Sequence, residues 1–238
     1  MRADLSARAV DARELMDDPD ADLRMLERTY ERFPLINAVV SRWRAVYRRD
    51  IRPRARTRVI RVLDVGAGGG DVSRALADWS RRDGLAIEVT ALDADARAVR
   101  WARSRGGGVK YRCAYTSELV DAGETFDIVI SNHLLHHLSG DELSSLLQDS
   151  AALISDGGVV LHRDIARSRL AYRGFAAGTL PFARNLLAGS FIRPDGLTSI
   201  RRAYTPAELS AVIPSGWSVR TALPARLELR YEVSDAGS

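Results

Sequence analysis

The side chains best suited to chemistry lie in two short parts of the chain. Asp64 and Asp93 each end an apolar run, and three of the four histidines fall between His133 and His137. Histidine suits proton transfer because its pKa lies near neutrality. A carboxylate that follows a buried strand is placed to bind a ligand at the strand's end. The sequence therefore indicates a binding site with two acids and a histidine-rich segment beside it.

A glycine-rich loop separates the first apolar run from a segment with helical character. Glycine occupies positions 66, 68, 69 and 70, and Asp71 follows. Glycines allow a tight turn and a close approach of the backbone to a ligand, at the positive end of the next helix. A dinucleotide fingerprint would need a small residue where this chain has Asp71. The loop therefore suits an amino-acid-bearing nucleoside such as S-adenosylmethionine better than a pyrophosphate.

The elements that must position these residues alternate between strand and helix. Strands are expected at residues 59–64, 86–93, 109–112, 125–132 and 157–162, and helices at residues 71–82, 94–104 and 140–154. This alternation predicts a parallel sheet with helices on both faces, and residues 217–221 and 227–233 add an antiparallel pair. In such sheets ligands bind at the carboxyl ends of the strands. The residues at or just beyond those ends are Asp64, Asp93, Tyr115, Asn132 and His162.

The order of these features resembles the class I S-adenosylmethionine-dependent methyltransferases, in particular their small-molecule branch. The matching stretches are Leu63-Asp-Val-Gly-Ala-Gly-Gly-Gly70, Ala91-Leu-Asp93, Phe126-Asp-Ile-Val-Ile-Ser-Asn132 and Leu135-His-His-Leu138. The resemblance implies an α/β, Rossmann-like fold: a seven-stranded, mostly parallel sheet with an antiparallel last strand and helices on both faces. It also implies an N-terminal helical cap at residues 1–55, a methyltransferase domain at residues 56–238, and a helical insertion after the fifth strand at residues 165–215.

The resemblance assigns the cofactor, S-adenosylmethionine, to specific residues. Asp64 is expected to orient its amino group, and Asp93 to accept hydrogen bonds from its ribose hydroxyls. The remaining cofactor contacts are expected at Gly66, Ala67, Gly68, Gly70, Ala94, Ala114, Tyr115 and Asn132. Tyr115 stands where the family usually has an acid that contacts adenine, which puts that contact in doubt.

Histidines are the candidates for the acceptor side of the site. The resemblance favours His136 and His162, and His133 is a third candidate. A base is needed only if the acceptor must lose a proton. The alternative is that the Leu-His-His segment is a scaffold signature without a catalytic histidine. No metal-binding spacing such as H-E-x-x-H is present, so no metal site is expected.

Two further segments are expected to complete the site. Residues 22–33 and 35–47 have helical periodicity with a break or a fresh start at Pro34. They would either fold over the cofactor as a cap or pack on the flank of the sheet. In the insertion, an apolar acceptor wall is expected from Phe175, Leu180, Phe182 and Phe191. The alternative is a surface helical pair that packs its own core.

Composition excludes several classes of protein. The chain of 238 residues has a net charge of +4, yet Lys110 is the only lysine among 35 basic residues and the arginines are spread beside 31 acids. That distribution argues against nucleic acid as a partner. Cys113 is the single cysteine, which excludes an internal disulfide. No apolar run reaches membrane-spanning length, and a cytoplasmic location is the default expectation.

The acceptor is expected to be a small, largely apolar aromatic or polyketide-like molecule. Adenine- and cytosine-modifying enzymes carry Asp/Asn-Pro-Pro-Tyr after the fourth strand, whereas this chain has Ser131-Asn-His-Leu-Leu135. Some segments resemble bacterial methyltransferases that act on polyketide or phenolic-lipid products. Methylation of a hydroxyl is therefore expected, with C-methylation of a quinone or polyketide ring as the alternative. A catalytically silent cofactor-binding protein, a dehydrogenase and a homodimer are left open.

Overall fold

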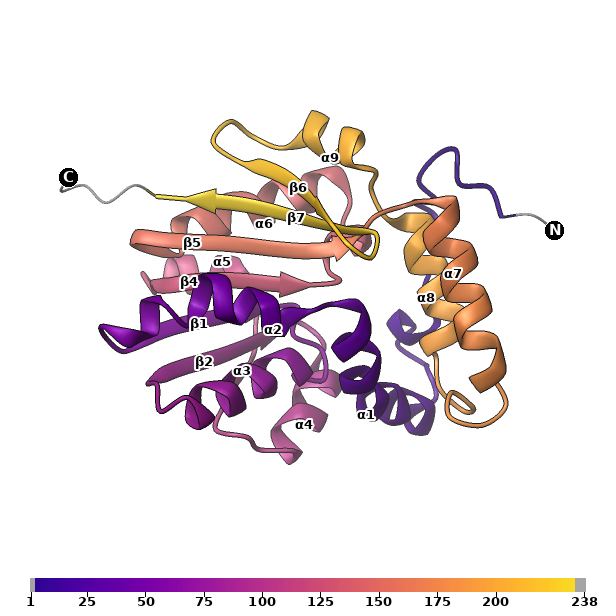
Figure 1. The fold of residues 1–238 in the computed structure, drawn as a ribbon, viewed down its shortest axis with the longest axis horizontal. Helices are drawn as coiled ribbons and strands as arrows, with labels where there is room; N and C mark the ends of the chain where they lie inside the picture. Colours follow the sequence, from indigo (N-terminus) through magenta and orange to yellow (C-terminus); the bar gives the residue numbers. More distant parts are fainter. Residues whose placement is uncertain (1–2, 234–238) are drawn as a thin grey trace.

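A single seven-stranded sheet forms the centre of the molecule. The computed structural model describes residues 3–233. The strands are β1 (Ile60–Val65), β2 (Ile87–Asp93), β3 (Lys110–Cys113), β4 (Phe126–Asn132), β5 (Ile154–Ile165), β6 (Ser218–Ala222) and β7 (Arg226–Glu232). Their order is β3-β2-β1-β4-β5-β7-β6, and β7 runs antiparallel to both of its neighbours (Figure 1). The predicted fold class is confirmed.

Residues 3–233 also form nine α-helices and five helical turns of three to five residues each. The α-helices are α1 (Leu23–Val40), α2 (Trp43–Val46), α3 (Asp71–Arg82), α4 (Ala96–Ser104), α5 (Thr116–Asp121), α6 (Gly140–Ala152), α7 (Arg169–Thr179), α8 (Ile192–Arg202) and α9 (Pro206–Val212). The shorter turns are η1 (Leu15–Asp17), η2 (Tyr47–Ile51), η3 (Arg54–Arg56), η4 (Leu135–His137) and η5 (Leu180–Phe182). In this described part, no helix has both the length and the apolar character needed to cross a bilayer.

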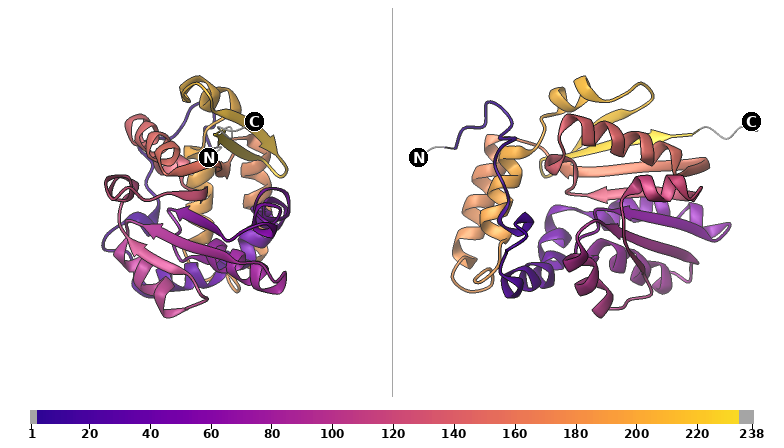
Figure 2. Two further views of the ribbon diagram at one scale, coloured as in Figure 1. Left: turned by 90° about the vertical axis from the view of Figure 1, so that its left-hand side faces the viewer. Right: turned by 180° about the vertical axis from the view of Figure 1, so that it is seen from behind.

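Apolar side chains cover the sheet on both faces. On one face, Leu119, Leu147 and Leu209 from α5, α6 and α9 pack in a cluster with the strands. On the other, Tyr47 of η2 and Leu76 of α3 pack with β1 and its neighbours. Burial of a large apolar side chain contributes about 1.5–3 kcal/mol. Figure 2 shows the helices on both sides of the sheet, as the strand–helix alternation predicts.

The predicted break at Pro34 is wrong, because α1 continues through this residue to Val40. A proline inside a helix removes one backbone hydrogen bond. Tertiary packing holds α1 together nonetheless, since Leu26 and Tyr30 lie in a cluster with Ala98 and Phe191. The chain turns instead at Arg42, whose left-handed φ of 51° separates α1 from α2.

The segments expected to form the cap and the insertion gather at one end of the sheet. Figure 1 shows the N-terminal segment, α1, α7 and α8 at the end to which the arrows of β4 and β5 point. Residues 43–55, by contrast, pack on the sheet beside β1. The domain bounds 1–55 and 56–238 stay predictions, and residues 1–2 and 234–238 within them lie outside the described residues.

Candidate active site

A cavity of about 1230 Å³ opens at the carboxyl ends of the parallel strands. Its walls come from η1, α1, the glycine loop, the ends of β2 and β4, η4 and α8. The predicted cofactor residues that line it are Asp64, Gly66, Ala67, Gly68, Asp93, Ala94, Ala114, Tyr115 and Asn132. The structure therefore brings together residues that are far apart in the sequence.

The glycine loop presents its backbone to this cavity. A Cβ at Gly68 would meet no atom within 4 Å, whereas one at Gly66 would lie 2.8 Å from Cδ1 of Leu134. The Gly68 N–H donates to Oδ2 of Asp93 at 2.6 Å, which joins the loop to the end of β2. Gly70 does not line the cavity; it precedes α3 with a left-handed φ of 71°. Gly70 allows the chain to turn tightly into α3, because glycine adopts a left-handed φ without steric cost.

Buried carboxyl groups dominate the half of the cavity beside the loop. Burial raises the pKa of Asp64 to about 7, although the Ser73 hydroxyl donates to it at 2.5 Å. Burial also raises the pKa of Asp93 and that of Asp71. In the described residues, no positively charged side chain offsets the charge of Asp64. A buried carboxylate without a positively charged partner is costly, so the cavity beside the loop favours a cationic ligand.

Three predicted adenine contacts lie on the same side. Ala94 follows β2, while Ala114 and Tyr115 connect β3 to α5. The Tyr115 N–H donates to Oε1 of Glu118 at 2.7 Å, and the Tyr115 side chain is 67% exposed. Its ring lies largely exposed at the cavity wall, and its contact with adenine stays a prediction.

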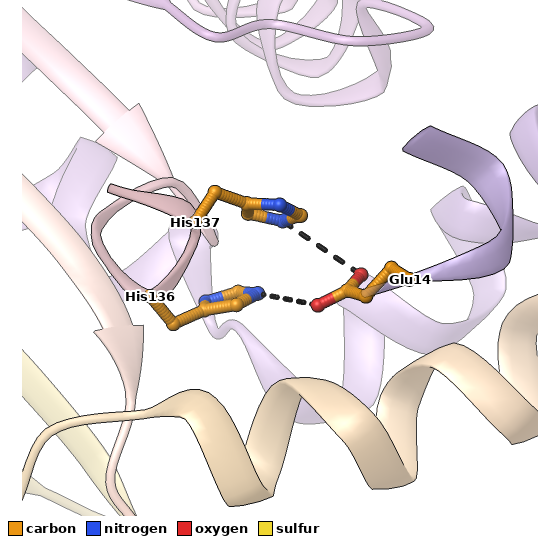
Figure 3. Close-up of side chains that lie close together, drawn as sticks. All are labelled: Glu14, His136 and His137. Carbon is orange, nitrogen blue, oxygen red and sulfur yellow. Dashed lines mark ion pairs between the residues drawn. The ribbon is translucent and has the colours of Figure 1, made fainter. Parts of the chain in front are cut away.

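His136 lies in η4 between two carboxyl groups. Its Nδ1 is 2.8 Å from Oδ1 of Asp164, and its backbone N–H donates to Oδ2 of the same residue at 2.8 Å. Its Nε2 is 3.2 Å from Oε1 of Glu14 (Figure 3). Burial alone would lower its pKa, but Asp164 and Glu14 raise it to about 9. In the protein alone His136 is therefore protonated near neutral pH and unable to accept a proton.

His133 lines the cavity next to Asn132 and has a different environment. Its φ is 60°, and its Nε2 lies 3.0 Å from Nη1 of Arg226 and 3.2 Å from Oγ of Ser41. Burial and the Arg226 guanidinium hold the pKa of His133 well below its usual range. Arg226 is fully buried and also donates to Oδ1 of Asn132 at 2.9 Å. His133 is therefore neutral, with one nitrogen facing the arginine.

His162 does not line the cavity, which corrects the expectation that it approaches the acceptor. It is fully buried on β5, between Oγ of Ser131 at 2.8 Å and Oγ of Ser150 at 3.2 Å. Its ring stacks on Trp217. Burial lowers its pKa to about 3. The side chain faces the layer that contains α6 because strand residues alternate between the two faces of the sheet.

The other half of the cavity is largely apolar. Phe175 and Phe191 line it as predicted, together with Phe33, Ile192 and Ile200. The expectation for Leu180 and Phe182 is wrong, because these side chains are 63% and 47% exposed and lie outside the cavity wall. They belong to η5, which follows α7, and α7 itself supplies the wall through Phe175.

Glu14, Asp17 and His137 also line the cavity and were missed in the sequence. Glu14 is 4% exposed, and Oγ of Ser199 donates to its Oε1 at 2.8 Å. Burial would raise the pKa of Glu14, but His136 and His137 hold it below its usual range. Nδ1 of His137 lies 3.0 Å from Oδ2 of Asp17. No local pattern distinguishes Glu14 from the acids beside it, so only the tertiary contact reveals it.

Comparison with known proteins matches the central part of the chain to a family model and most of the chain to curated relatives. A family model described as "Methyltransferase domain" matches residues 62–158. The chain is 30% identical over 183 residues to a ubiquinone biosynthesis O-methyltransferase of Xanthomonas axonopodis pv. citri (strain 306), covering 72% of this chain and 73% of the relative. It is 31% identical over 154 residues to the enzyme of that name from Rhizobium leguminosarum bv. trifolii (strain WSM2304), covering 63% of this chain. The chain spans only about half the length of the Rhizobium leguminosarum enzyme and of two further relatives of that name, at 55%, 56% and 43%.

Solved structures share the fold at low sequence identity. The plantazolicin methyltransferase BpumL in complex with S-adenosylhomocysteine aligns with a TM-score of 0.63 and 12% identity, covering 92% of each chain. A structure from a study of the conversion of a disulfide bond into a thioacetal group during echinomycin biosynthesis aligns with a TM-score of 0.52 and 21% identity. It covers 78% of this chain and 80% of that chain. These similarities concern the fold.

Proposed function

Because this chain belongs to the class I S-adenosylmethionine-dependent methyltransferases, we propose that it methylates a hydroxyl group of a small, largely apolar aromatic or polyketide-like acceptor. The observation that carries the proposal is the combination, in one cavity, of carboxyl groups beside the glycine loop and apolar side chains from the insertion. Asp64, Asp71 and Asp93 lie beside the glycine loop, whereas Phe175 of α7 lines the cavity from an apolar cluster with Ile165 and Ile200.

The carboxyl groups beside the glycine loop fit the family's cofactor. S-Adenosylmethionine carries an ammonium group and a sulfonium group, and the raised pKa of Asp64 marks a carboxyl that such a cation would stabilise in its ionised form. Asp93 already accepts the N–H groups of Gly68 and Asp95, at 2.6 Å and 2.8 Å. Each carboxylate oxygen has a second lone pair, so Asp93 would also accept from the ribose hydroxyls.

The cofactor, when bound, supplies a methyl group that is already activated by a positively charged sulfur. The protein must then hold the acceptor oxygen in line with that group and exclude water. Asn132 ends β4 and His133 follows it at the cavity wall, and Arg226 holds both through hydrogen bonds at 2.9 Å and 3.0 Å. We assign to His133 and His136 the positioning of the acceptor, and to His162 the support of the sheet behind them.

The apolar side chains of the cavity favour an acceptor with a ring or chain that carries few charges, since small-ligand sites are mostly apolar with a few polar groups. The names of the relatives, which are O-methyltransferases of ubiquinone biosynthesis, support transfer to oxygen over transfer to ring carbon. We also propose that residues 14–40 close over both ligands, because Met16, Tyr30 and Phe33 line the cavity.

Binding and transfer can be tested in sequence. Calorimetric titration with S-adenosylhomocysteine is expected to show binding, whereas NAD is expected to show none. Incubation with S-adenosylmethionine and a panel of phenols and catechols should then give a mass increase of one methyl group, located on oxygen by fragmentation. Asp93→Ala should reduce binding and Asp121→Asn, an exposed matched control, should leave it unchanged. Binding without transfer to any acceptor would favour a silent cofactor-binding protein, and a methyl group on carbon would favour the alternative reaction.

A further inference from the structure

Three side chains of the cavity wall form a set to which the proposed function gives no joint role, since of the three it uses only His136. Glu14, His136 and His137, here called the Glu14 cluster, offer one carboxylate and two imidazoles whose ligand atoms all lie within 4.8 Å of one another. Figure 3 shows both rings on η4 directed at the carboxylate of Glu14, the residue before η1. All three residues line the cavity.

Their separations suit a shared metal ion. Nε2 of His136 is 3.2 Å from Oε1 of Glu14, and Nε2 of His137 is 3.7 Å from Oε2. Ligands about 2.1 Å from a tetrahedral zinc ion lie about 3.4 Å from one another. Two imidazoles and one carboxylate are also a ligand set found at catalytic zinc sites and at other divalent transition metals.

One nitrogen in the Glu14 cluster lacks an aligned partner. Nε2 of His136 is buried and forms no hydrogen bond with residues 3–233, despite its ion-pair distance to Glu14. The His136 residue is only 1% exposed, so water does not satisfy this atom from outside. A buried polar atom whose only contact is misaligned is costly, and an ion between His136 and Glu14 would satisfy both groups.

The outer contacts of the Glu14 cluster are those that metal ligands usually have. Nδ1 of His136 contacts Asp164 at 2.8 Å, and Nδ1 of His137 contacts Asp17 at 3.0 Å, so each ring directs its Nε2 toward Glu14. Carboxylates in this position fix the orientation of a metal-binding imidazole and increase its basicity. Oγ of Ser199 donates to Oε1 of Glu14 at 2.8 Å, which orients the third ligand.

We propose that the Glu14 cluster binds a divalent transition-metal ion, such as Zn²⁺, whose open coordination position faces the cavity and takes an oxygen of the acceptor. The second part of this proposal rests on the proposed function, whereas metal binding itself does not. An acceptor hydroxyl bound to the ion would lose its proton to water at lower pH than in solution, as metal-bound water does. The ion would in this way supply a deprotonated phenolic oxygen. His133 is already engaged by Arg226, so deprotonation would depend on the ion. The favoured acceptors are then phenols and catechols.

The first test measures metal binding without cofactor or acceptor. The full chain is stripped with a chelator, dialysed and titrated with Zn²⁺ by calorimetry. We expect one ion per chain, and at least a tenfold loss of affinity in Glu14→Gln and in His137→Gln. Asp18→Asn changes an exposed acid in the same segment and should retain the native affinity. His137 has a side chain that is 24% exposed, so this variant remains informative if the buried Glu14 variant does not fold.

Two results would overturn the metal site. One is the absence of stoichiometric Zn²⁺ binding to the native chain, which would leave a proton-mediated ion pair as the role of the Glu14 cluster. The other is a Zn²⁺ affinity of Glu14→Gln or of His137→Gln that equals the affinity of the native chain and of the Asp18→Asn control. S-Adenosylhomocysteine titration of the same samples reports on the proposed function separately, because Asp64 and Asp93 are not part of the Glu14 cluster.

A second test addresses access from the cavity. The native chain is loaded with Co²⁺, whose visible absorption depends on its ligands and geometry, and is then titrated with pyrocatechol. A saturable change in the spectrum is expected, and no such change should occur with Glu14→Gln. An unchanged spectrum in the native chain would overturn the binding of an acceptor oxygen at the ion, even if Zn²⁺ binds.

Discussion

Single carboxyl groups set the electrostatics of the cofactor half of the cavity. Asp64 lies at the end of β1 and is 1% exposed, and its only hydrogen-bond donor among residues 3–233 is Ser73. Such a group destabilises the fold in its ionised form unless a cation compensates it. We therefore interpret Asp64 as a residue retained for ligand binding and not for stability.

The role of Asp93 can be separated from its structural contacts. Asp93→Ala should weaken S-adenosylhomocysteine binding by about 1–3 kcal/mol, the scale of hydrogen bonds to a charged group. Calorimetry should be repeated with an analogue that lacks the 2′-hydroxyl. If Asp93 holds the ribose, the native chain discriminates between the two ligands and the variant does not. Equal discrimination by both proteins would refute the ribose assignment.

The protonation of Asp64 should make cofactor affinity depend on pH. The pKa of Asp64 is about 7 in the protein alone, and a bound ammonium group would lower it. The neutral form predominates below this pKa, so binding there must release a proton and weakens as the pH falls. S-Adenosylhomocysteine affinity should rise by up to about tenfold per pH unit below about pH 7 and level off above it. Asp64→Asn should bind more weakly and with a flat profile; an unchanged slope in this variant would contradict the assignment.

At the level of elements, helix ends and interhelical contacts decide where the chain turns. Thr205 precedes α9 and accepts from the Glu208 N–H, while the Glu208 side chain accepts from the Thr205 N–H at 2.8 Å. Glu208 also pairs with the buried Arg167 of the segment after β5. This capping box begins the helix that joins the insertion to the last two strands.

Loss of this cap should be measurable as stability. Thr205→Ala removes the hydroxyl that satisfies the Glu208 N–H and should lower the free energy of unfolding by about 1 kcal/mol. Urea denaturation followed by circular dichroism provides the measurement. Ser218→Ala removes an exposed hydroxyl from β6 and should change the free energy far less. Equal effects of the two variants would show that the α9 cap contributes nothing specific.

Viewed as a whole, the molecule encloses its cavity with segments from three parts of the chain. Met16 and Tyr30 come from the N-terminal part, Gly68 from the central part, and Phe191 and Ile200 from the insertion. These parts also contact one another directly, since Leu15 and Met16 donate their N–H groups to Asp195 at 2.8 Å and 3.0 Å. A ligand in the cavity should therefore stabilise all three parts together.

Hydrogen exchange can detect this shared response. Saturation with S-adenosylhomocysteine should slow amide exchange in residues 14–40, 66–71 and 191–200 at once, because opening of any of these segments would expose the ligand. Strands β6 and β7 should change little, since they lie outside most of the cavity wall. Protection limited to residues 66–71 would show that the N-terminal segment does not close over the cofactor.

The pattern of residue types along the chain was sufficient to predict the sheet, the glycine loop and both acids at the strand ends. Periodicity and turn residues act over a few positions, and parallel strands necessarily bring their carboxyl ends to one edge. The continuity of α1 through Pro34 could not be predicted in this way, because Leu26 and Tyr30 are held by partners far away in the chain.

The cavity wall around Glu14 and His136 could not be predicted from the sequence, because its contacts join segments that are far apart in the chain. Glu14 meets His136 across more than a hundred residues, and His162 lies in the core because of the face of β5 that it occupies. Burial and neighbouring charges then set the pKa values of these groups, in opposite directions for His136 and His162. Residue type alone therefore identified the histidines, whereas only the packing of distant segments distinguished the charged imidazole at the cavity wall from the neutral one in the core.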